Sequence, residues 1–217
     1  MIAQLSWKYP ETEYGKTTNA QYVLWARRMG LIPQYDNQGD ILILLGGADI
    51  GTKPERDKHE LNLIDKYIET GKPIFGICRG MQLLGLRYGC TFVPHIPDVS
   101  KTLIHSAQDG GWKGNSSFHK IKDNQGNSFI INSRHHQGFL KSNTINMFCE
   151  EFCWSEDGIV EGIRGKDYNT LFSGVQYHPE REEVWSTDGE TIAKNELYRL
   201  IEHYSHGRSK IRNSQIS

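Results

Sequence analysis

The sequence predicts an α/β fold built around a mainly parallel sheet. In the first half of the chain, short apolar runs alternate with segments of helical period. Residues 41–45 and 74–77 are two such runs, and an uninterrupted apolar run is typical of a strand covered on both faces. Parallel neighbours need crossovers, so the helical segments between these runs indicate right-handed strand–helix–strand units.

Caps, stops and apolar periodicity locate the helices. Thr17 or Thr18 can cap a first helix, and Gly71 can end a second one. The last helix has an apolar stripe that includes Leu197 and Leu200. We expect helices over residues 17–30, 55–70, 79–88 and 188–204.

The remaining segments are richer in strands and turns. A weak first strand occupies residues 1–5. Further strands are expected over residues 128–131, 146–148, 151–154, 159–163 and 171–177. Residues 106–126 are polar and glycine-containing, so we expect a long surface excursion that could act as a lid. We expect one domain over residues 1–206 and a polar, frayed tail over residues 207–217.

Composition excludes several classes of function. The 217 residues carry a formal net charge of −1, which gives no basic field for nucleic acid. No apolar run approaches the roughly 20 residues of a membrane span, and the N-terminus lacks the layout of a signal peptide. The four cysteines show neither metal-type spacing nor the density of a disulfide scaffold, so we expect a cytoplasmic location.

Cys78 lies in the most informative segment, Gly76-Ile-Cys-Arg-Gly80, between an apolar strand and a helix. This is the cysteine form of a nucleophile elbow, in which the strand stops and the chain reverses tightly. The sulfur then lies at the start of a helix, where unpaired N–H groups favour a thiolate. Cys78 is therefore the candidate nucleophile.

A second segment, Leu45-Gly-Gly-Ala-Asp-Ile50, follows the other apolar strand. Its glycines leave backbone N–H groups unobstructed at the carboxyl edge of the sheet, as an oxyanion hole requires. We expect the N–H of Gly47 to serve with that of Arg79, whereas two glycines alone would indicate only a tight turn. The Arg79 side chain could form an ion pair within the protein or meet a substrate carboxylate, and we favour the former.

His178 is the candidate base, in the segment Gly174-Val-Gln-Tyr-His-Pro-Glu180. It falls where a strand ends, so it can meet Cys78 at the same sheet edge. Pro179 keeps it extended, and Glu180 can turn back to hold the other ring nitrogen. Alone, such a segment would indicate a surface turn.

Adjacent histidines occur in Asn132-Ser-Arg-His-His-Gln137. Neighbouring side chains of an extended chain point apart, so we expect a pocket-shaping loop and no metal ion. We expect His95, His105 and His119 to be ordinary loop histidines, although His119 could line the pocket. The three other cysteines are expected to be buried thiols.

Taken in order, Gly-Ile-Cys-Arg-Gly-Met-Gln, Asn-Ser-Arg-His-His-Gln and Gly-Val-Gln-Tyr-His-Pro-Glu resemble the class I (triad) glutamine amidotransferases. Gly-Gly-Ala-Asp-Ile and the arginine after the cysteine resemble the γ-glutamyl hydrolase branch, of the γ-glutamyl-γ-aminobutyrate hydrolase type. The likeness runs from about residue 14 to residue 180. The segment after Ile50 is shorter than in that branch, so the amine released need not be γ-aminobutyrate.

The resemblance implies a flavodoxin-like sheet with helices on both faces and a triad of Cys78, His178 and Glu180. It also implies that Gln82, together with Ser133, Arg134 and His135, holds the γ-glutamyl group.

Three functions stay open. The first is cysteine-dependent hydrolysis of a small-molecule γ-glutamyl amide, nucleotide-linked substrates included, through a γ-glutamyl thioester and without any cofactor. The second is a glutaminase subunit that supplies ammonia to a separate synthetase partner. The third is a non-catalytic binding protein on the same fold, against which the complete set of Cys78, His178 and Glu180 argues. A homodimer is compatible with each.

Overall fold

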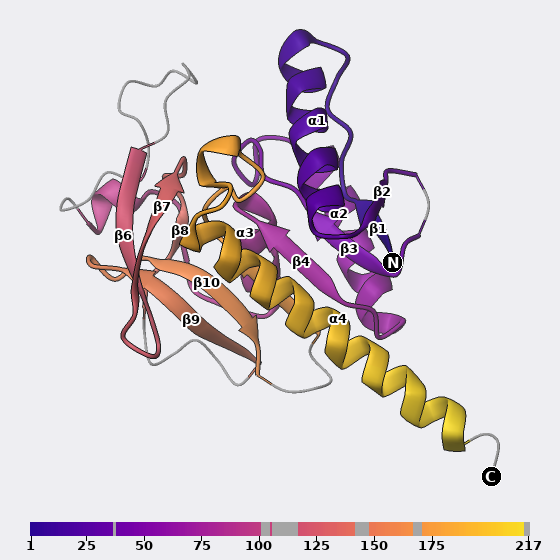
Figure 1. Ribbon diagram of the computed structural model, residues 1–217. Coiled ribbons are helices and arrows are strands. Elements are labelled where there is room, and N and C mark those ends of the chain that lie inside the picture. Colours follow the sequence, from indigo (N-terminus) through magenta and orange to yellow (C-terminus); the bar gives the residue numbers. More distant parts are fainter. Residues whose placement is uncertain (37, 101–104, 106–116, 142–147, 167–170, 215–217) are drawn as a thin grey trace.

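The computed structural model of the chain describes residues 1–36, 38–100, 105, 117–141, 148–166 and 171–214. One large sheet runs through these residues, in the order β2-β1-β3-β4-β11-β10-β9-β6-β7 (Figure 1). Its strands are β1 (Ile2–Leu5), β2 (Ile32–Gln34), β3 (Ile41–Leu44), β4 (Ile74–Ile77), β6 (Ser117–Asp123), β7 (Ser128–Ser133), β9 (Cys149–Ser155), β10 (Val160–Gly165) and β11 (Phe172–Val175). A short pair, β5 (Phe92–Val93) with β8 (Gly138–Phe139), forms a separate ribbon.

The strands from β2 to β11 pair in parallel, and those from β11 to β7 pair antiparallel. The predicted α/β fold is therefore confirmed, with an antiparallel extension at one end. The four helices of the described residues are α1 (Glu13–Arg28), α2 (Pro54–Glu69), α3 (Arg79–Arg87) and α4 (Asp188–Ser214), and the short 3-10 turns are η1 (Ile96–Asp98) and η2 (Glu182–Val184). None of these helices is both long and apolar enough to cross a bilayer.

Helices cover both faces of the parallel half, as expected. On one face, Trp25 of α1 and Leu197 of α4 belong to the same buried cluster as Ile43. On the other, Tyr67 of α2 and Leu84 of α3 cluster with Leu42 and Leu44. Side chains of alternate β3 residues thus pack against the helices on opposite faces of the sheet, which explains the uninterrupted apolar run of this strand.

The helix ends differ from the sequence expectation. The first helix begins at Glu13, because Thr12 is its cap and accepts the N–H of Gly15 on its side-chain oxygen at 3.1 Å. The last helix continues to Ser214, past the expected end at Tyr204. The helix thus includes residues 207–214 of the expected tail, since no proline interrupts it and one internal glycine costs only about 1 kcal/mol, and fraying of this tail stays a prediction. Residues 215–217 lie outside the described residues.

The expected surface excursion over residues 106–126 is wrong in its second part. Residues 117–123 form β6, which pairs with both β7 and β9. His119 and Ile121 are buried, while Lys120 and Lys122 face outward. This alternation is the period of a half-buried strand, and it is present in the sequence. Residues 106–116, and the expected strand at 146–147, lie outside the described residues.

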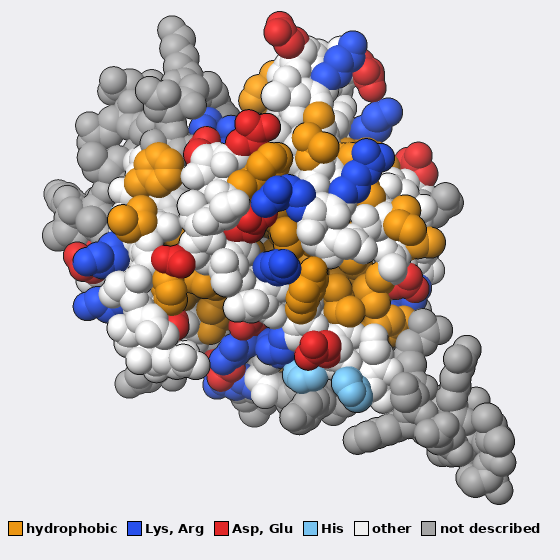
Figure 2. All heavy atoms as spheres, in the orientation of Figure 1, with side chains coloured by type: hydrophobic (Ala, Val, Ile, Leu, Met, Phe, Trp, Pro, Cys, Tyr) orange, Lys and Arg blue, Asp and Glu red, His pale blue; other side chains and the backbone are white. Residues whose placement is uncertain are grey.

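Charges of both signs are mixed with apolar side chains on the face that Figure 2 shows, and neither sign dominates it. All four cysteines are free and buried, and the burial of Cys90, Cys149 and Cys153 agrees with the sequence prediction.

Gly80 marks the closest approach of α3 to the sheet. A Cβ atom there would lie 2.3 Å from the Leu44 carbonyl oxygen, and this backbone atom cannot rotate away. We expect Gly80→Ala to lower the free energy of unfolding by about 1–3 kcal/mol, measured by urea denaturation.

Gly138→Ala is the matched control, because a Cβ atom at Gly138 meets only side-chain atoms at 3.5 Å or more. Equal stability of Gly80→Ala and Gly138→Ala would contradict this packing.

Candidate active site

Cys78 occupies the sharp turn between β4 and α3. Its φ of 51° lies in the left-handed region, which is a strained conformation for a residue with a side chain. The Cys78 N–H donates to the carbonyl of Val175 at 2.8 Å, which ties the turn to the neighbouring strand β11. A Cβ at Gly76 would lie 2.6 Å from the backbone of Gly80, so the elbow needs glycine at both positions. The predicted elbow geometry is present, with Cys78 5% exposed.

His178 follows β11 and reaches the same edge of the sheet. Its Nδ1 lies 2.7 Å from Oε1 of Glu180. The sequence did not single out Asn132, whose side chain accepts the His178 N–H at 2.9 Å and donates to the His178 carbonyl at 3.1 Å. This double contact fixes the backbone of the histidine, and Glu180 fixes the ring.

The electrostatics of the site centre on His178. Burial alone would lower the pKa of His178, but Glu180, together with a charge interaction and a hydrogen bond from Cys78, raises this pKa to about 10. Burial would raise the pKa of Glu180, and the charge of His178 outweighs burial and lowers it. A Cβ at Gly46 would lie 2.9 Å from Cε1 of His178 and 3.6 Å from Cβ of Cys78, so Gly46 borders both groups.

Two glutamine side chains form a hydrogen-bonded chain that ends at the sulfur of Cys78. Nε2 of Gln176 lies 3.5 Å from Sγ of Cys78, and its Oε1 accepts from Nε2 of Gln82 at 3.2 Å. Gln82 also donates to the carbonyl of Gln137 at 2.9 Å. The amide of Gln82, expected to hold substrate, thus donates within the protein. Gln176 lies nearer to the sulfur, and no local pattern marks it beyond its place in the histidine segment.

The glycine turn after β3 carries one of the two expected oxyanion donors. The Gly46 N–H donates to the hydroxyl of Tyr22 at 3.0 Å, and Gly46 O accepts from Tyr9 at 2.6 Å and from Arg56 at 2.7 Å. Among the described residues no partner takes the Gly47 N–H, and Gly47 has a φ of 138°. The Arg79 N–H lies in the first turn of α3, where it has no acceptor within the helix. Both donors are thus available, and their joint use as an oxyanion hole stays a prediction.

The Arg79 side chain turns away from the sulfur, as expected. It pairs with Glu60 and Asp57 of α2 and is 2% exposed. Glu60 also pairs with Arg56 at 3.1 Å and accepts the Ser6 hydroxyl at 2.6 Å. This buried network links the elbow to the glycine turn, because Arg56 also holds the Gly46 carbonyl. Removing one partner of such a pair is costly, since it leaves a buried charge unpaired.

The expected substrate loop divides into two parts. Ser133 is fully buried and donates its hydroxyl to the His105 carbonyl at 2.6 Å. His135 is 4% exposed and contacts the Gln137 carbonyl through Nδ1 at 3.0 Å. Arg134 is half-buried. Burial is the main cause that lowers its pKa, and the positive charge of Arg181 lowers it further. Of the three, only Arg134 presents a side chain that is partly open to solvent.

The adjacent histidines point apart, as predicted. His136 is half-buried and its Nε2 lies 2.9 Å from Oδ2 of Asp49, which follows the glycine turn. His135 instead joins a buried group with His105 and His119. The expectation of a loop histidine is wrong for His119, which lies within β6. His105 lies outside the helices and strands, as expected, but both histidines are almost fully buried.

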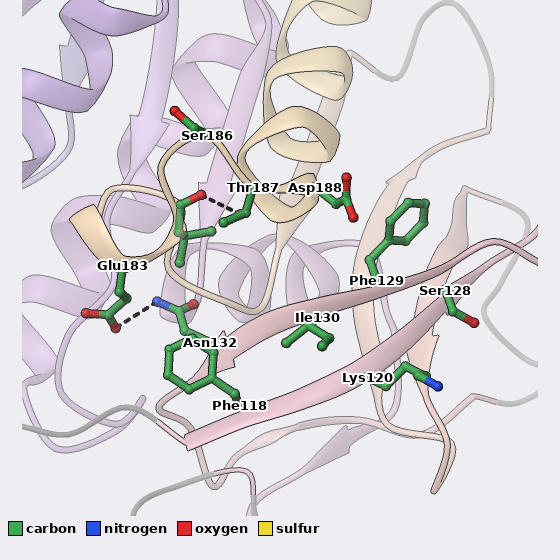
Figure 3. A pocket seen from close by; sticks show the side chains of 11 residues that line it. Phe118, Lys120, Ser128, Phe129, Ile130, Asn132, Glu183, Ser186, Thr187 and Asp188 are labelled. Carbon is green, nitrogen blue, oxygen red and sulfur yellow. Dashed lines mark hydrogen bonds between the residues drawn. The ribbon is translucent and has the colours of Figure 1, made fainter.

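A groove of about 610 Å³ lies beside this site, between the β6–β7 pair and the start of α4 (Figure 3). Asn132 forms part of its wall and donates to Glu183 at 3.2 Å. Phe118 and Ile130 line it from the strands, and both are more than half exposed. Cys78 is not among its lining residues, so this groove does not reach the sulfur.

The fold and the cysteine elbow define a class I glutamine amidotransferase-like protein. A profile of the peptidase C26 family matches residues 45–180, and the chain belongs to this family. Membership of this family indicates a cysteine hydrolase-type enzyme.

Several relatives carry related descriptions. NtpR of Enterococcus hirae is 32% identical over 168 residues, covering 67% of this chain and 69% of its own. YvdE of Lactococcus lactis, named glutamine amidotransferase-like, is 28% identical and covers 72% of both chains. Anthranilate synthase beta subunit 2 of Arabidopsis thaliana is 28% identical over 60% of this chain and 45% of its own.

A solved structure from Thermoplasma acidophilum, described as a GMP synthase subunit, has a TM-score of 0.66 and covers 98% of both chains. Its sequence identity of 16% means that it shows the shared fold alone. These similarities support the class of glutamine amidotransferase-like proteins. They do not distinguish the γ-glutamyl hydrolase branch within that class.

Replacing Glu180 tests the electrostatic arrangement. We expect Glu180→Gln to lower the pKa of His178 from about 10, because the imidazolium loses its carboxylate partner. Titration of the His178 ring by NMR measures this shift. Since the folded pKa lies above the ordinary value of 6.5, the His178 charge stabilises the fold fully below pH 6.5 and loses that contribution as the pH rises through 10.

Glu182→Gln is the matched control, since Glu182 is exposed and only two residues further along the chain. An unchanged His178 titration in Glu180→Gln, or an equal shift in Glu182→Gln, would contradict the assignment of Glu180 as the partner.

Proposed function

We propose that this protein hydrolyses a γ-glutamyl amide through a thioester on Cys78. One observation carries the proposal: Cys78 and His178 both border Gly46 at the ends of β4 and β11, and Glu180 lies 2.7 Å from Nδ1 of the imidazole. A buried cysteine, base and orienting carboxylate in this order form the arrangement that activates a sulfur nucleophile. Membership of a cysteine hydrolase-type family supports this choice of reaction.

The first half of the reaction forms the acyl-enzyme. The Cys78 thiolate attacks the γ-carbonyl carbon, and the N–H groups of Gly47 and Arg79 receive the negative oxygen. As the C–N bond breaks, His178 passes its proton to the departing amine. Glu180 holds the ring in place and stabilises its charged form before this transfer.

The second half restores the enzyme. Neutral His178 takes a proton from water, and the resulting hydroxide attacks the thioester. The C–S bond breaks, glutamate leaves and Cys78 returns to the thiolate paired with imidazolium. Each step moves one proton through His178, so the reaction needs no redox partner.

The substrate side rests on Arg134. A γ-glutamyl group carries an α-carboxylate, and a guanidinium is the side chain best suited to bind it through two hydrogen bonds. Arg134 is partly open to solvent in the loop after β7, whereas Ser133 and His135 are buried, which supports its assignment to the substrate side. Gln82, Ser133 and His135 then shape the pocket from behind, since their side chains are buried. The reducing cytoplasm is the compartment we propose, because all four cysteines are free thiols.

The alternative is a glutaminase subunit that passes ammonia to a separate synthetase partner. It is favoured by the similarity to a relative named as a subunit of anthranilate synthase. The chemistry at Cys78 would be the same, with free glutamine as the substrate. The two proposals differ in what the isolated protein hydrolyses.

A screen of free glutamine and substituted γ-glutamyl amides, followed by glutamate release from the isolated protein, separates these functions. The hydrolase proposal predicts a higher kcat/KM for a substituted amide than for glutamine. Cys78→Ala should lose at least about 10⁴-fold in kcat, while Cys90→Ala, which alters a buried thiol away from the elbow, should retain activity.

Turnover of glutamine alone, at a low rate that a partner protein raises, would support the glutaminase alternative. Substantial activity in a folded Cys78→Ala protein would contradict both proposals. Circular dichroism of both variants verifies that they fold.

A further inference from the structure

A buried cluster of three histidines and one carboxylate lies behind the candidate active site. We call His105, His119, His135 and Glu161 the histidine–Glu161 cluster. Each of its members is at most 6% exposed. They come from four separate segments: Glu161 from β10, His119 from β6, His135 from the loop after β7, and His105 from the chain before β6. The proposed mechanism uses none of them to touch substrate.

The spacing of the cluster matches that of metal ligands. Oε1 of Glu161 lies 3.4 Å from Nδ1 of His105, 3.0 Å from Nε2 of His119 and 3.4 Å from Nε2 of His135. Ligand atoms of His105, His135 and Glu161 all lie within 4.8 Å of one another. A tetrahedral zinc site with bonds of about 2.0–2.1 Å places its ligands about 3.3 Å apart.

The outer ring nitrogens of two histidines are held by acceptors. Nδ1 of His135 meets the Gln137 carbonyl at 3.0 Å, and a carbonyl only accepts, so this nitrogen carries the proton. Nε2 of His105 lies 3.1 Å from the carboxylate of Asp157. In the neutral rings the lone pairs of both histidines therefore face Glu161. Outer acceptors of this kind orient the histidines of metal sites.

Polar atoms inside the cluster lack hydrogen-bond partners. Nδ1 of His105, Nε2 of His135 and Oε2 of Glu161 are buried and unpaired, although the first two lie 3.4 Å from the other oxygen of Glu161. The contacts are close but lack hydrogen-bond geometry. Nitrogen lone pairs aimed at a carboxylate repel one another unless a positive charge lies between them. A cation at the centre would satisfy all three atoms at once.

We propose that His105, His135 and Glu161 bind one Zn²⁺ ion, with Nε2 of His119 holding Oε1 of Glu161 at 3.0 Å. Two imidazole nitrogens and one carboxylate oxygen suit zinc and disfavour magnesium or calcium, which prefer oxygen ligands. This inference revises the expectation of no metal, which rested on the adjacent pair His135 and His136 and on His105 and His119 as loop histidines.

The ion would hold in place the residues that contact the sulfur of Cys78 and their neighbours. The Glu161 carbonyl accepts the N–H of Gln176, whose side chain contacts the sulfur. The Gln137 carbonyl that holds His135 also accepts from Gln82, and Ser133 donates to the carbonyl of His105. These contacts make the cluster a positioning element for the floor of the pocket. The proposal does not depend on which substrate the site takes.

Metal content tests the proposal without reference to activity. The protein purified from zinc-containing medium and dialysed should hold one zinc per chain by mass spectrometry of the element. Glu161→Gln and His135→Ala should lose the zinc, and Asp157→Asn should weaken its affinity about 10- to 100-fold through His105. His136→Ala is the matched control and should keep the zinc, because His136 pairs with Asp49 outside the cluster.

Two measurements on the unaltered chain guard against variants that fail to fold. Cobalt exchanged for zinc should give the visible absorption of a tetrahedral site, and a strong chelator should lower the melting temperature. Absence of both zinc and the cobalt spectrum in the folded protein would overturn the proposal. The cluster would then be held by protons and hydrogen bonds, without a metal ion. Zinc retained in folded Glu161→Gln and His135→Ala, or lost equally in His136→Ala, would also overturn it.

Discussion

The parallel pairing of β4 with β11 is the constraint on which the site depends. These strands lie far apart in the chain, yet their register sets Ile77 opposite Val175. Cys78 follows directly after Ile77, and its N–H continues the ladder to the Val175 carbonyl. His178 leaves the neighbouring strand three residues further on. A register shift of one residue would turn each side chain to the other face of the sheet and separate the sulfur from the imidazole.

The surrounding structure holds the elbow in its strained conformation. A positive φ at a cysteine costs free energy, so it persists only where neighbouring contacts determine the backbone. The close approach of Gly80 to Leu44 and the buried pairing of Arg79 with Glu60 supply such contacts. The second also explains why an arginine follows the nucleophile without pointing at the substrate. Stability and site geometry therefore depend on the same residues.

The sequence predicted the parts of this structure that depend on local pattern. Apolar runs and glycines located β3, β4 and the elbow, because those signals lie within a few residues of one another. The same logic located His178 and Glu180, since a proline and a carboxylate follow the histidine directly. The helix cap at Thr12 and the alternation in β6 were also local signals, which we misread in favour of Thr17 and of a polar loop.

The remaining features depend on contacts between distant segments. Nothing near Asn132 in the sequence shows that its amide holds the backbone of His178. Gln176 and Gln82 meet beneath the sulfur only because β11 and α3 pack together. The histidine–Glu161 cluster gathers four segments, and none of them has the spacing of a known metal motif. Such sites require the fold before they can be recognised.

The most direct measurement is a rapid acid quench during turnover of a γ-glutamyl anilide, whose good leaving group makes hydrolysis of the thioester the slow step. The account predicts an initial burst of released amine and a glutamyl group on the peptide that contains Cys78, lost once substrate is exhausted. Turnover with no covalent adduct, or an adduct on another cysteine, would contradict it.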